Sequence, residues 1–181
     1  MPRAVWARPF QSIAGGVVVG LSASLITQQY VGAVPAVISF TTFCGGFAIF
    51  ASIVGVTSNY IESIEGIITW AIDGLAALLL LAAGIALAVQ LGSTSCGSIL
   101  DDARRGRKDP NPLLTGGCHL KEAAESWGCY NNAFKDEKKG EALIMGRCQR
   151  VQADSAFAFI AFIACVAAAA LSFLSVRRTK Y

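Results

Sequence analysis

Four long runs of apolar residues constrain this chain more than any other feature of its sequence. Crossing roughly 30 Å of bilayer hydrocarbon takes about 20 apolar residues in an α-helix, because every backbone N–H and C=O needs a partner within the segment. Runs of that length lie at residues 10–29, 34–56, 66–91 and 153–176. With 54% hydrophobic and only 15% charged residues, the 181-residue chain could hardly cover a water-soluble surface. We predict an all-α integral membrane four-helix bundle, formed as a single domain over residues 1–181.

A cleaved signal peptide is the alternative interpretation of the first run, since Arg3 and Arg8 precede it. The run is, however, longer than a typical signal core. Gln28, Gln29 and Tyr30 follow it, where small cleavage-site residues would be expected. An uncleaved first helix is the better interpretation.

Short links join the first three predicted helices, and one long hydrophilic loop at residues 92–152 precedes the fourth. Pro35 follows the first link and suits the first turn of a helix, where its missing N–H costs nothing. The second link, at residues 57–65, is polar and short enough for a helical hairpin. Glycines and prolines break up the long loop, in which we predict one short amphipathic helix at residues 119–127.

Two of the six cysteines, Cys44 and Cys165, lie inside apolar runs, where a free thiol behaves as a small hydrophobic residue. The other four lie in the long loop: Cys96, Cys118, Cys129 and Cys148. An even number of cysteines in a segment with little core of its own predicts two disulfides. Of the three pairings, we favour the nested one, in which Cys96–Cys148 clamps the third helix to the fourth and Cys118–Cys129 lies within it. A four-cysteine zinc site is the rival, weakened by the lack of a CxxC spacing.

Basic residues near the helix ends point to two opposite topologies. One group would place both termini in the cytoplasm: Arg3, Arg8, Arg177, Arg178 and Lys180. The other would place the long loop there: Arg104, Arg105, Arg107, Lys138, Lys139, Arg147 and Arg150. We expect cytoplasmic termini and an extracellular loop, because a loop of about sixty residues translocates largely regardless of its charge. Four clustered cysteines also fit an oxidising compartment better than the cytosol.

Small residues recur every four positions along the first run, at Ser12, Gly16, Gly20 and Ser24, and so share one helix face. Gly16 and Gly20 form a GxxxG motif, in which small side chains let another backbone come close. This face either packs within the bundle, the interpretation we favour, or packs against another copy of the protein.

Asp73 is an intramembrane acid about two turns inside the third predicted helix, and such acids are functional candidates. At that depth it would alternatively reach the cytoplasmic interface or bond Ser and Thr groups of neighbouring helices. The pattern offers no second intramembrane acid, histidine or lysine for a proton relay, because Asp154 lies at the opposite end and His119 lies in the loop.

Groupings typical of enzymes are missing from the sequence. It holds a single histidine, no metal-ligand cluster, no phosphate-binding loop and nothing like a catalytic triad. We therefore predict no enzyme activity, no cofactor and no bound metal. The basic run at residues 104–108 is flanked by acids, which indicates a solvated mixed-charge surface rather than a nucleic-acid site.

Two blocks of sequence resemble the fungal MARVEL-domain proteins of the non-classical export type, four-helix plasma-membrane proteins associated with eisosomes. The first block is WAIDGL at residues 70–75, continuing through AAGIALAV at residues 82–89 to Ser95 and Cys96. The second is GRCQR at residues 146–150, followed by QA and AFAF at residues 152–159. Family members match Cys96 and Cys148 as a flanking pair. This chain departs from them in a longer loop that adds Cys118 and Cys129 and in a much shorter cytoplasmic tail.

The resemblance implies a plasma-membrane microdomain linked to sphingolipids or sterols, with lateral self-association and other eisosome proteins as partners. The function we predict is accordingly that of a microdomain organiser. A small transporter or channel subunit that uses Asp73 is the second hypothesis. A tetraspanin-like adaptor is the third, weakened because the adjacent cysteines and following glycine of tetraspanins are absent.

Overall fold

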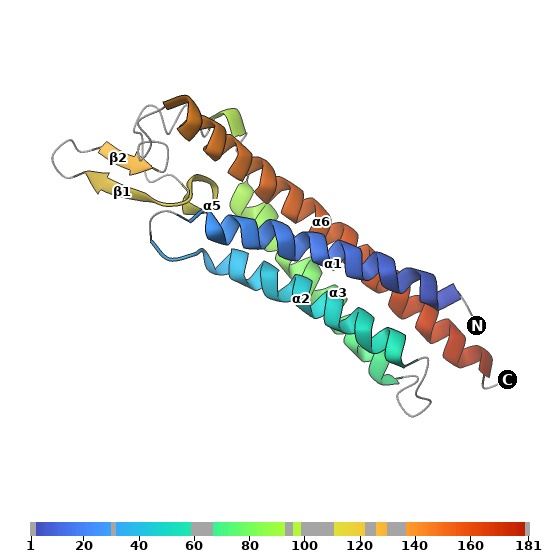
Figure 1. Cartoon of the computed structure of the whole chain (residues 1–181). Coiled ribbons are helices and arrows are strands. Elements are labelled where there is room, and N and C mark those ends of the chain that lie inside the picture. The colour runs from blue at the N-terminus through green and yellow to red at the C-terminus, as the bar shows by residue number, and fades with distance from the viewer. Residues whose placement is uncertain are drawn as a thin grey trace.

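A computed structural model describes residues 3–29, 32–58, 67–92, 96–98, 111–121, 126–129 and 137–179. Four long helices dominate it: α1 (Arg3–Thr27), α2 (Ala36–Thr57), α3 (Ile67–Leu91) and α6 (Glu137–Thr179). They run alternately up and down, so the start of α1 and the end of α6 lie at the same end of the bundle (Figure 1). Residues 59–65 of the predicted second link (residues 57–65) and the basic run at residues 104–108 lie outside the described residues.

Each helix packs against two neighbours, in the cyclic order α1, α2, α3, α6. The four helices are long and apolar enough to cross a bilayer. The chain is therefore a multi-pass membrane protein with an all-α four-helix bundle, as the apolar runs predict. Because α1 and α3 lie diagonally opposite, any direct bond between them must pass through the centre of the bundle.

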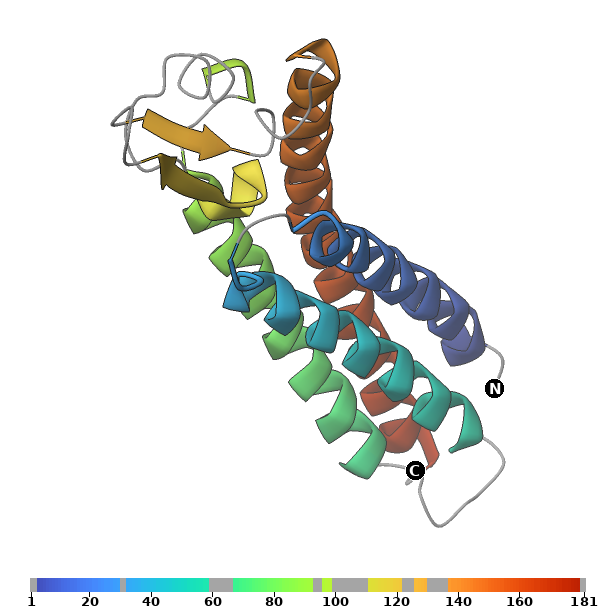
Figure 2. The ribbon, with the colours of Figure 1, turned by 60° about the vertical axis from the view of Figure 1, so that its left-hand side comes forward.

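Helix α6 begins at Glu137 rather than near residue 153, where apolar residues alone would start it. Its 43 residues correspond to about 65 Å of helix, twice the thickness of the hydrocarbon, so it cannot be confined to the bilayer. Figure 2 shows its first turns rising past the other helices beside the strands.

The segment between α3 and α6 holds a short helix, α5 (Pro112–Thr115), and a hairpin of β1 (Cys118–Lys121) with β2 (Ser126–Cys129). The predicted amphipathic helix at residues 119–127 is therefore wrong, because both described ends of that stretch are strands. In the register, Cys118 faces Cys129 and Leu120 faces Trp127. Cross-strand hydrogen bonds satisfy this backbone in place of the helical bonds that the prediction assumed.

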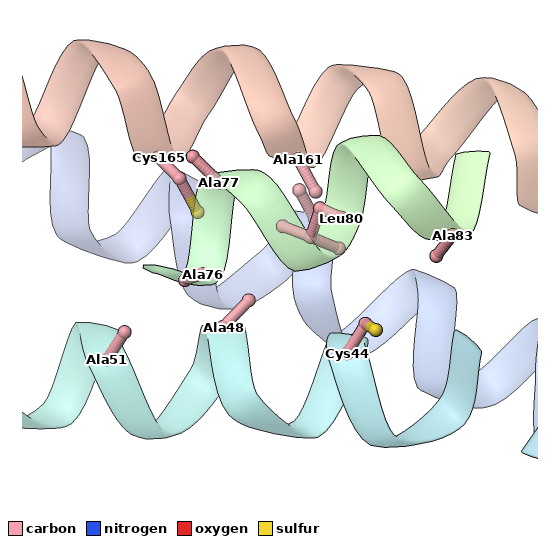
Figure 3. Close-up of a cluster of buried hydrophobic side chains, with 10 residues drawn as sticks. Cys44, Ala48, Ala51, Ala76, Ala77, Leu80, Ala83, Ala161 and Cys165 are labelled. Carbon is pink, nitrogen blue, oxygen red and sulfur yellow. The ribbon is translucent and has the colours of Figure 1, made fainter. Parts of the chain in front are cut away.

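The centre of the bundle is packed by small side chains. Figure 3 shows this layer, formed by Ala14, Cys44, Ala48, Ala51, Ala76, Ala77, Leu80, Ala83, Ala161 and Cys165. Gly15 and Gly45 bring α1 and α2 closest, since a Cβ added to either would lie 3.0 Å from the carbonyl oxygen of the other. Close backbones maximise van der Waals contact, which replaces the hydrophobic effect between helices in lipid.

A second apolar layer lies toward the hairpin end, where Leu25, Ile38, Leu87, Leu113 and Val151 are buried together. The free thiols of Cys44 and Cys165 are both buried, as expected of small hydrophobic residues.

Candidate functional site

A buried ion pair joins the two diagonal helices near the end of the bundle that carries the chain termini. Arg8 Nη1 donates to Asp73 Oδ1 at 2.6 Å, and the two side chains are 3% and 1% exposed. Gln11 Nε2 donates to the same oxygen at 3.3 Å, and Arg8 Nη2 donates to Ser172 Oγ at 3.1 Å. We call Arg8, Gln11, Asp73 and Ser172 the Arg8–Asp73 cluster, which links α1, α3 and α6.

Helix α2 makes room for this cluster. A Cβ added to Gly55 would overlap the guanidinium of Arg8, so any larger residue there would force that group to move. Ser52 Oγ donates to the carbonyl oxygen of Arg8 at 2.9 Å and accepts a bond from Ser12 Oγ at 2.7 Å. The guanidinium is thus enclosed by all four helices.

The two carboxylate oxygens of Asp73 differ in their bonding. Asp73 Oδ2 is buried and has no hydrogen-bond partner among the described residues, whereas Oδ1 accepts two bonds. The expected bonding of Asp73 to Ser and Thr groups is wrong, because Arg8 and Gln11 take that place. A buried charge needs an opposite charge in hydrocarbon, and Arg8 supplies it.

Aromatic rings mark the depth of the pair. Trp70 and Phe173 are about half exposed, and their ring centroids lie 6.3 Å apart across α3 and α6. Asp73 follows Trp70 by one helical turn, which places the ion pair just inside this aromatic boundary. About 20 residues, or 30 Å of helix, cross the hydrocarbon. Counted forward from Trp70 on α3, the opposite boundary lies near Gln90, and counted backward from Phe173 on α6, it lies near Ala153.

A second buried arginine fastens the hairpin end. Arg147 is 2% exposed and donates from Nη1 to the Leu25 carbonyl oxygen, from Nε to the Leu113 carbonyl oxygen and from Nη2 to Gln29 Oε1. The three distances are 2.8, 2.9 and 2.9 Å. A cation at the C-terminal end of α1 satisfies carbonyl groups that have no partner within the helix.

Helix α5 is held against the same end of the bundle. Asn111 caps its start by accepting from Leu113 N at 3.0 Å, and its Nδ2 donates to the Gln90 carbonyl oxygen at 2.8 Å. Gly116 ends the helix with φ of 79°, a conformation that favours glycine. This part of the long loop is therefore packed onto the bundle rather than projecting from it.

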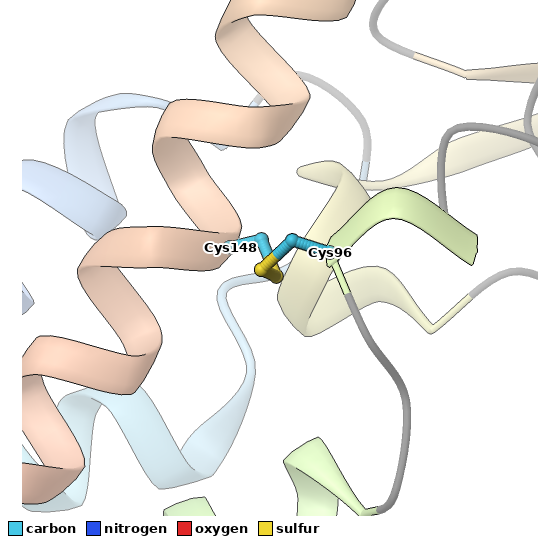
Figure 4. The surroundings of a disulfide bond; sticks show 2 residues. All are labelled: Cys96 and Cys148. Atoms are coloured by element: carbon cyan, nitrogen blue, oxygen red, sulfur yellow. A yellow bond between two sulfur atoms is a disulfide. The ribbon is translucent and has the colours of Figure 1, made fainter.

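The Cys96–Cys148 disulfide closes the loop on α6 and confirms the flanking bridge of the nested pairing (Figure 4). The rival zinc site would need both of these cysteines. No group of metal-ligating side chains occurs in the part of the chain that the structure describes. The side chains of Cys118 and Cys129 lie outside the described set, so their bridge stays a prediction, but their backbones are direct partners in the hairpin.

The predicted small-residue face divides into two parts. Ser12 is half-buried and bonded to Ser52, and Ser24 Oγ donates to the Leu21 carbonyl oxygen at 2.8 Å. Gly16 and Gly20 are exposed, and a Cβ added to either would meet nothing within 4 Å. These two glycines therefore do not pack within the bundle, contrary to the interpretation we favoured, and Gly15 provides that contact instead.

Sequence reasoning missed the roles of Arg8 and Gln11, although a signal for both was present. In an up-and-down bundle the starts of the first and third helices lie at the same level. Arg8 and Asp73 each occur within two turns of such a start, and Gln11 follows Arg8 by three residues on the same face. Because Arg8 was interpreted only as a charge flanking the membrane span, its pairing with Asp73 was not predicted.

The Arg8–Asp73 cluster and the bonds of Arg147 both hold helices to one another. The apolar layer between them, shown in Figure 3, contributes no charged side chain among the described residues. We find no nucleophile–base pair there either; the nearest thiol, Cys165, accepts a bond from Gln11 Nε2 at 3.3 Å.

A comparison with protein families identifies the family to which the chain is similar. The model of the membrane-associating domain, MARVEL, covers residues 3–171 and therefore all four helices. Comparisons with curated proteins and with solved structures gave no match.

Proposed function

The chain belongs to the MARVEL family of membrane-associating domains, and from that premise we propose that it organises a plasma-membrane microdomain by associating laterally with itself and with particular lipids. Its role would then be structural rather than enzymatic. The fold supports this role because its polar side chains are used to bind helix to helix, leaving lipid-facing surfaces for neighbours.

The observation that carries the proposal is the outward face of α1. Gly16 and Gly20 form GxxxG, are exposed and meet no atom of their own bundle. A backbone exposed in this way lets a second helix approach closely. In lipid, where the hydrophobic effect does not drive helices together, the van der Waals contact of such close packing favours association. Ile13, exposed on the same face, adds apolar contact area.

The sidedness we propose puts both termini in the cytoplasm and the segment between α3 and α6 outside the cell. Support comes from the Cys96–Cys148 disulfide, since oxidising compartments favour such bonds. A second bridge between Cys118 and Cys129 forms part of the same proposal, supported by their direct pairing in the hairpin register.

The lipids and partners we propose come from the resemblance described above. They are sphingolipids or sterols, together with other eisosome proteins of a fungal plasma membrane. The outer surface offers aromatic side chains to such lipids, with Phe43 and Phe50 exposed on α2 on either side of Gly46.

The experiment compares two leucine substitutions at exposed helical glycines. Gly20→Leu covers the GxxxG face of α1, whereas Gly46→Leu, the matched control, changes an equally open glycine on α2. Each replacement favours the helix by up to about 1 kcal/mol, so neither should unfold the bundle. We expect cross-linking and energy transfer between copies in liposomes to fall for Gly20→Leu alone. Equal clustering of both variants and the wild type would refute this face as the contact.

A transporter or channel subunit is the second candidate function, favoured by the buried, unpartnered Oδ2 of Asp73. Against it stand the Arg8 partner and the apolar layer next to the cluster. Reconstituted vesicles decide between the two. Flux of ions or protons that Asp73→Asn abolishes would establish transport, and equal, background flux from both proteins would exclude this role for Asp73.

A further inference from the structure

The second buried acid, Asp154, has a different environment from Asp73. It is fully buried on α6, where its Oδ2 accepts a bond from Ser22 Oγ of α1 at 2.6 Å. Its other oxygen, Oδ1, is buried and has no hydrogen-bond partner among the described residues. One hydroxyl is thus the whole set of donors that the described chain gives this carboxyl group.

Asp154 forms no ion pair with any residue that the structure describes. On α6, Arg150 lies one turn before Asp154, is half-buried and forms no described ion pair with it. Arg147 lies two turns before Asp154 and directs its guanidinium at the carbonyl groups of Leu25 and Leu113. On α1, the charged residues are Arg3 and Arg8, both near the start of the helix at the other end of the bundle, and Arg8 is paired with Asp73. The described residues of α2 and α5 carry no charge, and the only charged residue described on α3 is Asp73.

An ionised carboxylate in this position would be costly. Burying a lone charge without a partner is so unfavourable that the group usually takes up a proton instead. A protonated carboxyl group avoids this charge cost, because Oδ2 still accepts from Ser22 and Oδ1 then carries a neutral O–H group. The site also lies at the bilayer boundary estimated near Ala153, so the proton has a short path to water.

We propose that Asp154 is a proton-binding site, which holds a proton on Oδ1 in the folded protein and releases it to the aqueous phase at the disulfide end as the pH of that phase rises. Release leaves a buried carboxylate held by Ser22 alone and weakens the contact between α1 and α6. The bundle would therefore loosen as the pH at this end rises. This inference does not depend on lateral self-association.

The sign of the effect follows from proton uptake on folding. An unfolded chain releases the proton of an aspartate above about pH 4, whereas the folded site keeps it to a higher pH. Folding therefore binds one proton in that window, and stability falls as the pH rises until the folded site has released its own proton. For one proton the unfolding equilibrium constant rises by up to about tenfold for each pH unit.

The test measures unfolding of the full chain in nanodiscs across this pH range, for the wild type and Asp154→Asn. Asparagine mimics the protonated group but cannot titrate, so the wild type should lose stability relative to the variant as the pH rises. Asp73→Asn serves as control and should keep the wild-type slope. A constant difference between wild type and Asp154→Asn would overturn the proposal.

Infrared spectra of the wild type provide a second measurement, should Asp154→Asn fold poorly. We expect the stretching band of a protonated carboxyl group at mildly acidic pH, where an exposed aspartate is already ionised, shifted by deuterium exchange and lost as the pH rises. It should persist in Asp73→Asn and change frequency in Ser22→Ala, which removes the hydroxyl donor. Absence of the band at mildly acidic pH in the wild type would overturn the proposal independently of any variant.

Discussion

Removing the guanidinium of Arg8 tests what the ion pair contributes to the fold. Arg8→Met keeps most of the apolar stem and deletes two bonds to other helices, to Asp73 Oδ1 and Ser172 Oγ at 2.6 and 3.1 Å, and one within α1, to Gln11 Oε1 at 3.1 Å. Bonds between helices in membranes average roughly 0.6 kcal/mol each, so the two bonds to other helices alone would cost only about 1 kcal/mol. The larger loss comes from Asp73, which is left buried without its cation. Breaking one side of a buried ion pair typically costs about 3–5 kcal/mol, and we expect Arg8→Met to fall in that range.

The assay is reversible unfolding in mixed micelles, followed by circular dichroism. A loss of about 3–5 kcal/mol raises the unfolding equilibrium constant by roughly two to four orders of magnitude. The double variant Arg8→Met with Asp73→Asn removes the stranded charge and should recover much of this loss. A cost near 1 kcal/mol for Arg8→Met, with no recovery in the double variant, would refute the reasoning, because hydrogen bonds alone would then explain it.

Three further predictions test other parts of the structure. Cys96→Ser and Cys148→Ser remove the same bridge, spanning 52 residues, so each should lower stability by about 4 kcal/mol in thermal unfolding and the pair no more than either alone. Gly55→Ala should cost about 1–3 kcal/mol because its Cβ overlaps Arg8, and the same change in an Arg8→Met background should cost less; equal costs would mean that the two positions do not meet. Lys138→Cys, at an exposed position, should react with a membrane-impermeant thiol reagent on intact cells; reaction only after the cytosolic side is opened would reverse the proposed sidedness.

Sequence patterns predicted the bundle because hydrocarbon imposes length and composition on every span. The same rule could not place the start of α6, since residues 137–152 are polar and helical outside the expected apolar run. A hydropathy pattern records contact with lipid, whereas this extension is held by Arg147 and the disulfide at Cys148. Long-range bonds of this kind leave no local pattern.

The hairpin and the glycines show two other limits. Residues 119–127 alternate too weakly to separate a helix from a strand, and pairing between β1 and β2 decides the structure. Along α1, Gly15 and Gly16 are neighbours in sequence, yet one packs against Gly45 and the other faces outward. The spacing of small residues shows that a face exists, but only the rotation of the helix in the bundle shows what that face meets.

The most direct test of lateral association is the mass of the unit released from the membrane in nanodiscs with its lipids retained. We predict that the wild type is released as several copies with bound lipid, and that Gly20→Leu is released as a folded single chain. If the wild type, at its natural concentration in the membrane, were released as single chains without retained lipid, this would contradict the claim that the protein organises the membrane by packing against its own copies.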